Sequence, residues 1–190
     1  SMDKAENIGP TVVKMMNNAT AELVLKETKN ILGELGIVFF LRHGTCLGAI
    51  RDGKLISWDD DLDVGSIIGL NGLDEKAIYH GTNAFKNNGF RATVSETDFY
   101  ISVELEKSGI PLDWTCYRIL DDSIFQYPAV RIPVELHYSL KEINFLGEHF
   151  LVPSPPEKYL ELKYGPDWMT PKKTGFEHDI IKAIPDNTIT

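Results

Sequence analysis

The sequence predicts one α+β domain in which a mixed β-sheet is flanked by helices. Helical and strand-like segments follow one another without the regular strand–helix–strand rhythm of parallel α/β proteins. The 190 residues are 43% hydrophobic, so we expect a single domain over 1–190 with its core at about 36–171. No run approaches the ~18 consecutive apolar residues that cross a bilayer, so no membrane span is expected.

The first half of the chain carries both helical and strand patterns. Apolar residues recur at roughly helical spacing before Gly36, which marks a helix end. Five apolar residues in succession then predict a buried strand, and the alternation in Asp61-Leu62-Asp63-Val64 predicts a half-buried one. The expected elements are a helix over 11–35, a strand over 37–41, a turn at 43–45, a short helix over 46–51 and a strand within 58–66.

The second half is divided by turn residues. Asn88-Gly89 ends a helical stretch, a Lys-Ser-Gly turn at 107–109 joins two strands, and Gly147 marks the centre of a hairpin. Two prolines at 155–156 precede a helix, because proline is favoured in a helix's first turn. The expected elements are a helix over 73–86, strands over 90–94, 100–105 and 110–117, a hairpin over 143–152, a helix over 157–164 and an irregular tail after Pro171.

Charge and cysteine content exclude several classes of protein. The net charge of −9 argues against a surface that binds nucleic acid, and an acidic protein handles phosphates only with a cation or a local basic group. Cys46 and Cys116 are too few for a disulfide scaffold or a four-cysteine zinc site, and both lie in apolar stretches. We expect reduced core cysteines and a cytoplasmic location, peripheral to a membrane if the acceptor is made there.

Four carboxylates fall within five positions at Asp59, Asp60, Asp61 and Asp63. Two like charges ~4 Å apart repel by about 1 kcal/mol in water and about 4 kcal/mol at an effective dielectric near 20. On a strand Asp61 and Asp63 leave from the same face, so they are expected to converge on one or two Mg²⁺ or Mn²⁺ ions while Asp60 points away. A solvated acidic loop remains an alternative; an EF-hand is excluded because Gly65 falls one position late and Leu70 replaces the bidentate glutamate.

Three motifs in order carry a resemblance to a known superfamily. Gly44-Thr45 is followed by Asp61-Leu62-Asp63-Val64 and then by Asp113 between two hydrophobic residues. This arrangement resembles the nucleotidyltransferases that include DNA polymerase beta. The stretches 44–51 and 58–63 and the closing Tyr-Gly-Pro-Asp-Trp-Met at 164–169 resemble the LicD family more closely, and the resemblance covers roughly 41–171.

The resemblance implies a nucleotidyltransferase fold and a reaction. It implies transfer of a phospho-alcohol, such as phosphocholine, from a CDP-alcohol or other nucleotide donor to a sugar or glycan hydroxyl. Asp61, Asp63 and Asp113 would be catalytic and would hold the Mg²⁺ or Mn²⁺, which suits a reaction that needs positioning and charge neutralisation. For Asp113 an edge-strand carboxylate facing water is the alternative.

The substrate would be bound by residues around the first two motifs. Backbone amides at Gly44 and Thr45 would face the donor phosphates, and Arg51 would reach them with its planar fork. Trp58 would stack on a base or sugar, and Asp59 would orient Arg51 or a metal-bound water. Each residue also has a structural interpretation: a helix cap for Thr45, a surface arginine for Arg51, a core tryptophan for Trp58 and a strand cap for Asp59.

Two other functions remain open. A nucleotidyltransferase that moves a nucleoside monophosphate to a small acceptor would share all three carboxylates. A non-catalytic nucleotide-binding module would keep the fold alone. A glycosyltransferase with an Asp-x-Asp motif fits less well, because Gly44-Thr45 and Asp113 have no place in it.

Overall fold

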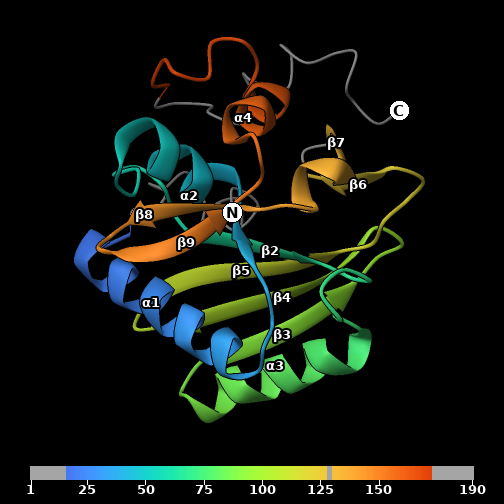
Figure 1. Cartoon of the computed structure of the whole chain (residues 1–190). Helices are drawn as coiled ribbons and strands as arrows, with labels where there is room; N and C mark the ends of the chain where they lie inside the picture. The colour runs from blue at the N-terminus through green and yellow to red at the C-terminus, as the bar shows by residue number, and fades with distance from the viewer. Residues whose placement is uncertain (1–15, 128–129, 173–190) are drawn as a thin grey trace, which may run out of the picture.

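The fold is built on one mixed five-stranded sheet with strand order β1-β2-β5-β4-β3 (Figure 1). The computed structural model describes residues 16–127 and 130–172. Strands β2 and β5 are parallel and all other neighbours are antiparallel, so the predicted mixed sheet is confirmed. The strands are β1 (Phe40–Leu41), β2 (Leu62–Ile67), β3 (Arg91–Glu96), β4 (Tyr100–Lys107) and β5 (Ile110–Tyr117).

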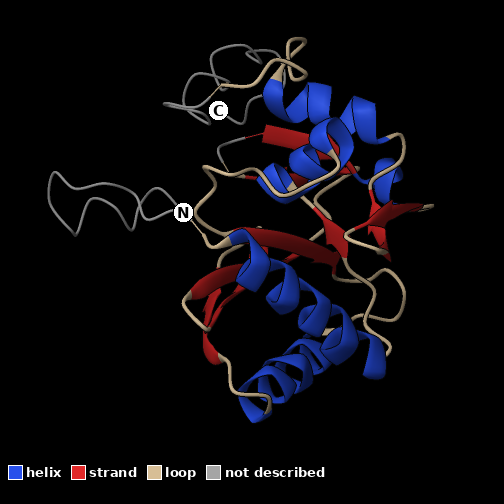
Figure 2. Cartoon of the chain, turned by 90° about the vertical axis from the view of Figure 1, so that its left-hand side faces the viewer, coloured by secondary structure: helices blue, strands red, loops and turns tan. Residues whose placement is uncertain are grey.

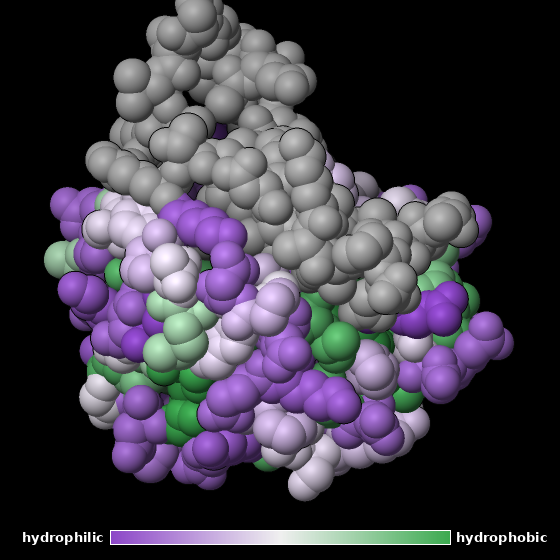
Figure 3. Space-filling model, turned by 90° about the horizontal axis from the view of Figure 1, so that it is seen from above, coloured by the Kyte–Doolittle hydropathy of each residue, from purple (hydrophilic) through white to green (hydrophobic). Residues whose placement is uncertain are grey.

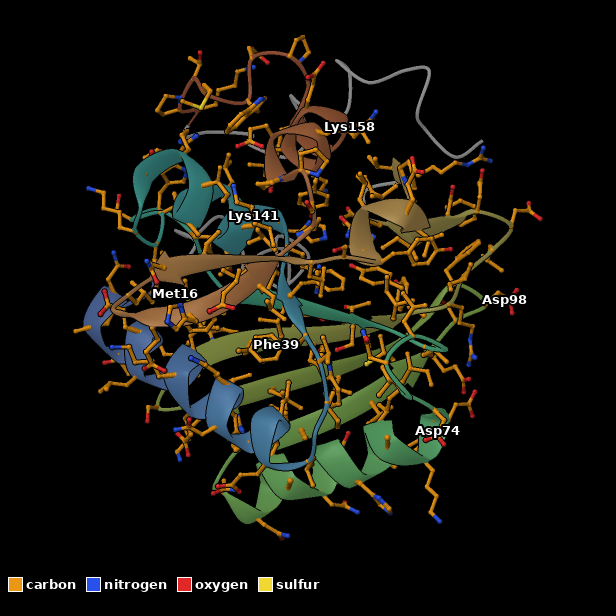
Figure 4. The ribbon with its side chains drawn as sticks, viewed as in Figure 1. Met16, Phe39, Asp74, Asp98, Lys141 and Lys158 are labelled. Atoms are coloured by element: carbon orange, nitrogen blue, oxygen red, sulfur yellow. The ribbon has the colours of Figure 1, made fainter. Side chains whose placement is uncertain are left out.

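Two helices, α1 (Asn18–Glu34) and α3 (Glu75–Asn87), cover one face of this sheet (Figure 2). Each begins at a side-chain cap: Asn17 accepts from the Thr20 amide, and Asp74, at the start of α3 in Figure 4, accepts from the Ala77 amide. Trp114 of β5 is fully buried under α3, where a Cβ on Gly81 would lie 2.8 Å from its ring. The packing of α3 on Trp114 fixes the position of β5, and therefore that of Asp113.

The opposite face of the sheet carries the smaller elements. They include α2 (His43–Leu47), the π-helix η3 (Gly48–Asp52), the 3₁₀-helix η4 (Val134–His137) and α4 (Pro156–Tyr164). Two hairpins complete this layer: β6 (Ser123–Gln126) with β7 (Val130–Pro133), and β8 (Lys141–Phe145) with β9 (Glu148–Val152). Helix α2 packs on β2 of the sheet, and α4 packs on β7 within this layer.

Most predicted elements are confirmed. The helices over 73–86 and 157–164, the strands over 90–94, 100–105 and 110–117 and the hairpin over 143–152 all form, with ends shifted by a few residues. Both cysteines are buried and free, as expected. The first helix starts at Asn18, and the part of that prediction over 11–15 lies outside the described residues, as does the tail from 173.

Four boundary predictions were wrong, each for a local reason. The strand expected over 37–41 pairs only at Phe40 and Leu41, because the Ser66 hydroxyl bonds the Val38 carbonyl in place of a ladder partner. The strand expected within 58–66 starts at Leu62, so Asp61 lies just before it. The turn expected at 43–45 already belongs to α2, and the helix expected over 46–51 continues as a π-helix. The β6–β7 hairpin was not predicted.

The described surface shows no large apolar area in the view from above. In Figure 3 hydrophobic residues lie in small groups among hydrophilic ones on the described part of this face. Within the described residues no helix combines the length and apolarity needed to cross a membrane.

Candidate functional site

Asp63 of β2 and Asp113 of β5 are neighbours in the sheet. The parallel register pairs them directly, so their side chains leave the same face. Nη2 of Arg42 lies 3.5 Å from Asp63 Oδ1 and 2.9 Å from Asp113 Oδ1. The two carboxylates therefore share one cationic neighbour, as the prediction of a common site requires.

Asp113 is held by three side chains. Its Oδ1 accepts from Arg42 Nη2 at 2.9 Å and from the Thr115 hydroxyl at 2.6 Å. The Ser102 hydroxyl on neighbouring β4 lies 3.3 Å from the same oxygen. These contacts come from three elements, so the orientation of the Asp113 carboxylate is strongly restricted.

Asp61 is the most buried carboxylate of the site, with 8% of its surface exposed. Burial raises the pKa of Asp61 well above its ordinary value, and the nearby charges of Asp63 and Asp60 raise it further. A divalent cation would stabilise the ionised form, so the Asp61 carboxylate is well suited to serve as a ligand of a metal ion.

Asp60 was wrongly predicted to point away from the site. Carboxylate oxygens of Asp59, Asp60 and Asp61 all lie within 4.8 Å of one another, the one such group of three in 16–127 and 130–172. These residues precede β2, and the Asp59 side chain bonds the Asp60 amide, so strand alternation does not apply to them. Asp60 thus joins the set of oxygen donors that could bind a cation.

Two hydrogen bonds attach helix α2 to its neighbours, one to strand β2 and one to helix α4. The buried Thr45 hydroxyl accepts from the Asp63 amide at 2.9 Å, and the His43 amide donates to the Tyr159 hydroxyl of α4 at 3.0 Å. Gly44 and Thr45 lie in the first turn of α2, where no preceding helical carbonyl accepts their amides. Thr45 therefore positions Asp63, and the predicted contact of its hydroxyl with phosphate stays a prediction.

Gly44 is in close contact with the Asp59 side chain. A Cβ built on Gly44 would overlap Asp59 Oδ2. The expected reason for this glycine was close approach to a donor phosphate; in the structure the Asp59 carboxylate makes the close approach. The Gly44–Asp59 contact packs the start of α2 against the acidic segment before β2.

Gly44→Ala is expected to destabilise the protein by about 1–3 kcal/mol, because an added methyl group must displace the Asp59 carboxylate. Gly33→Ala is the matched control: a Cβ there meets no atom within 4 Å, and the residue lies in α1. The control should gain about 0.5–1 kcal/mol, the usual helical preference of alanine over glycine. Urea unfolding of both variants measures the difference, and equal free energies of unfolding would contradict the packing role of Gly44.

Arg51 is paired within its own π-helix. Its Nε and Nη2 donate to Asp52 Oδ1 and Oδ2 at 2.9 and 3.0 Å, and 3% of its side chain is exposed. Asp52, rather than the expected Asp59, therefore orients this guanidinium. Arg51 Nη1 and Trp58 Nε1 are buried donors without a hydrogen-bond partner among the described residues. Two unsatisfied N–H groups in η3 and the loop after it would suit an anionic ligand.

The structure also assigns a residue that the sequence analysis missed. Arg42 is 4% exposed and is the residue through which Asp63 and Asp113 are connected. In the sequence, Arg42 directly follows the apolar residues 37–41. A cation buried at such a position requires a buried partner. The site thus brings together β2, β5, α2 and the segment before β2.

Comparison with protein families agrees with this geometry. A family model described as "LicD/FKTN/FKRP, nucleotidyltransferase domain" matches residues 36–155. The match includes all three predicted catalytic aspartates and Arg42.

Comparison with curated proteins gives similar relatives. The chain is 27% identical over 173 residues to ribitol-5-phosphate transferase FKTN of Macaca fascicularis, covering 86% of this chain and 36% of that protein. It is 26% identical over 153 residues to ribitol 5-phosphate transferase FKRP of Homo sapiens, covering 72% of this chain and 29% of that protein. The chain thus spans about a third of the length of the curated relatives it matches.

Among solved structures, the solution structure of the antibiotic-resistance factor ANT(2'')-Ia has a similar fold. The TM-score is 0.56 at 15% sequence identity, and the alignment covers 88% of this chain and 84% of that one. A crystal structure of the same factor in complex with adenylyl-2''-tobramycin gives a TM-score of 0.49 at 16% identity, over 71% of this chain and 70% of that one. The predicted nucleotidyltransferase fold is confirmed.

Proposed function

The chain belongs to the LicD/FKTN/FKRP nucleotidyltransferase-domain family, a family of transferases, and from this premise we propose that it moves a phospho-alcohol from a CDP-alcohol donor to a sugar or glycan hydroxyl. The observation that carries this proposal is the register pairing of Asp63 with Asp113, with the buried Asp61 close enough to Asp63 for their charges to interact. Three carboxylates at one end of a parallel strand pair are suited to phosphoryl-group transfer.

Asp113 is proposed as the general base. Its Oδ1 accepts from Arg42 and Thr115, whereas Oδ2 has a longer, 3.5 Å contact with the Ser102 hydroxyl, so Oδ2 is the oxygen better placed to accept a proton from the acceptor hydroxyl. The acceptor oxygen forms a bond to the phosphorus of the phospho-alcohol, and the diphosphate P–O bond breaks. Cytidine monophosphate leaves with the electron pair of that bond.

The donor set of the site fits a hard divalent cation. Asp61, Asp63 and Asp113 would hold one or two Mg²⁺ or Mn²⁺ ions, because carboxylate oxygens are preferred by these metals over the nitrogen and sulfur ligands typical of zinc. When bound, the cation supplies charge neutralisation at the transferring phosphoryl group. The raised pKa of Asp61 supports this assignment, because burial and the neighbouring charges disfavour its ionised form and a bound cation would favour it.

A donor screen tests the proposal. The protein is incubated with CDP-choline, CDP-ethanolamine, CDP-glycerol or CDP-ribitol, with Mg²⁺ or Mn²⁺ and a panel of sugar acceptors, and phosphorus NMR follows the products. Release of cytidine monophosphate with the phospho-alcohol on the acceptor supports the proposal. Transfer of the nucleoside monophosphate itself would identify the alternative nucleotidyltransferase activity, and Asp63→Asn serves as the inactive control.

Arg51→Lys is expected to weaken binding of the donor nucleotide by about tenfold, because one ammonium group cannot replace a planar fork. In the structure two nitrogens of that fork contact Asp52, so we assign Nη1 to the donor phosphates. Isothermal titration with the donor measures affinity, and thermal unfolding reports the structural part. Arg91→Lys, whose side chain is 81% exposed, is the matched control and is expected to bind the donor as wild type does. Equal affinities for Arg51→Lys and wild type would make Arg51 a purely structural residue.

A further inference from the structure

Arg42 has a fixed position between the two paired carboxylates. It is the N-cap of α2, so its backbone is fixed by the start of the helix. Its Nε donates to the Val64 carbonyl of β2 at 2.8 Å, and Nη2 donates to Asp113 Oδ1 and to the Thr115 hydroxyl at 2.9 and 3.0 Å. The guanidinium therefore connects α2, β2 and β5 through separate hydrogen bonds.

The neighbouring strand leaves space for this side chain. A Cβ built on Gly65 would lie 3.2 Å from Arg42 Cδ, closer than an ordinary contact, and 2.8 Å from the Phe40 ring. The Tyr117 ring centroid lies 5.8 Å from the guanidinium carbon. Burial alone lowers the pKa of Arg42, but Tyr117 and the two carboxylates raise it above the ordinary value, so the group stays charged.

We propose that Arg42 is a positioning residue for the third carboxylate and also the resident counter-charge of Asp63 and Asp113 when no metal is bound. This inference rests on the proposed function, since it concerns the same site. By holding Asp113 Oδ1, Arg42 and Thr115 keep Oδ2 in one orientation for the acceptor hydroxyl. By offsetting the repulsion between two adjacent carboxylates, Arg42 keeps the site formed before the cation arrives.

The positioning role and the counter-charge role of Arg42 have opposite effects on the site. A fixed positive charge within 3.5 Å of Asp63 Oδ1 repels a divalent ion that binds the same carboxylate. Arg42 therefore lowers the metal affinity of the site while it favours the catalytic geometry. A residue that only stabilised the fold would favour both metal binding and the catalytic geometry. Mn²⁺ affinity and kcat measured on the same variants therefore separate the proposed roles of Arg42 from a purely structural one.

The test compares two substitutions with Mn²⁺ alone as the probe, its binding followed by electron paramagnetic resonance. Arg42→Gln removes the charge, and Mn²⁺ should bind about tenfold more tightly than to wild type. Arg42→Lys keeps the charge but cannot hold Asp113 and Thr115 together, so Mn²⁺ affinity should stay within about threefold of wild type. With the donor found by the screen, kcat should fall by about 10²-fold in both variants while donor KM changes little. Arg91→Gln, whose side chain is 81% exposed, is the matched control.

Thr115→Val keeps the test decisive if Arg42→Gln fails to fold. It removes one hydrogen bond to Asp113 and keeps every charge, so kcat should fall by about tenfold with unchanged Mn²⁺ affinity. The inference about Arg42 would be overturned by a wild-type kcat in Thr115→Val. It would also be overturned if a folded Arg42→Gln bound Mn²⁺ no more tightly than wild type does. Either result would leave the proposed function unaffected. Absence of Mn²⁺ binding by the wild-type protein would instead overturn the metal site of the proposed function, and this inference with it.

Discussion

Asp61→Asn and Asp63→Asn are each expected to abolish metal-dependent turnover without unfolding the protein. An amide retains the shape of the side chain but binds Mg²⁺ and Mn²⁺ much more weakly than a carboxylate does. Removing the buried Asp61 charge also relieves repulsion within the metal-free cluster, so the melting temperature of Asp61→Asn without metal should hold or rise; Asp63→Asn also weakens the contact with Arg42, which offsets this gain. Turnover with the screened donor, Mn²⁺ binding and thermal unfolding are the three measurements.

The pH dependence of stability gives a second readout for Asp61. Its folded pKa is raised above the unfolded value, so the folded state binds the proton more tightly. Without metal, stability should fall as pH rises from the ordinary aspartate value through the raised one, and Asp61→Asn should remove most of this decline. Asp98→Asn, on an exposed loop beyond β3 in Figure 4, is the control. Unchanged turnover in Asp61→Asn or in Asp63→Asn would contradict the metal-site proposal.

Asp113→Asn is expected to lower turnover by about 10²–10⁴-fold, the usual contribution of a general base. The affinity for the donor nucleotide should stay within about tenfold, because Asp61 and Asp63 still offer carboxylate ligands to the cation. Asparagine is the informative substitution, since its carbonyl oxygen still accepts from Arg42 Nη2 and from the Thr115 hydroxyl. Asp113→Ala would leave the buried Arg42 without this partner and would confuse stability with catalysis.

The measurement compares kcat and donor affinity in wild type, Asp113→Asn, Asp113→Ala and Asp63→Asn. If Asp113→Asn turns over like wild type while Asp63→Asn is inactive, Asp113 is not the base. Asp113→Ala should in addition lose stability, by less than the about 3–5 kcal/mol of a fully unpaired buried charge, because Arg42 keeps its 3.5 Å contact with Asp63. A stability equal to that of Asp113→Asn would show that Arg42 finds another partner.

The sequence predicted the sheet well wherever periodicity was strong. Strand β5 alternates side chains between two buried faces, and helix α3 begins at Asp74 and ends before Gly89, so both were found. Periodicity alone cannot pair Asp113 with Asp63, because the two residues are distant in the sequence. The resemblance to the nucleotidyltransferase superfamily supplied this pairing. The register Asp63↔Asp113 confirms it.

Predictions failed where side chains replaced regular backbone pairing. The Asp59 carboxylate accepts from the Asp60 amide before β2 begins at Leu62, so strand alternation does not set the direction of Asp60. Ser66 bonds the Val38 carbonyl and shortens β1. Arg42 was missed because its partners lie on strands distant in sequence, and no periodic pattern reports such contacts. Asp52 was likewise not foreseen as the partner of Arg51.

The parallel pairing of β2 with β5 has a consequence for how this protein folds. Helix α3 and strands β3 and β4 lie between the two strands in the chain, so the pairing is non-local. Local hairpins such as β4–β5 close quickly, whereas a parallel pair must wait for the intervening chain to be ordered. The acidic residues therefore come together late, and their repulsion adds to the barrier of that step. Divalent cations that bind the folded site should slow unfolding more than they speed refolding, which stopped-flow kinetics with and without Mg²⁺ would measure.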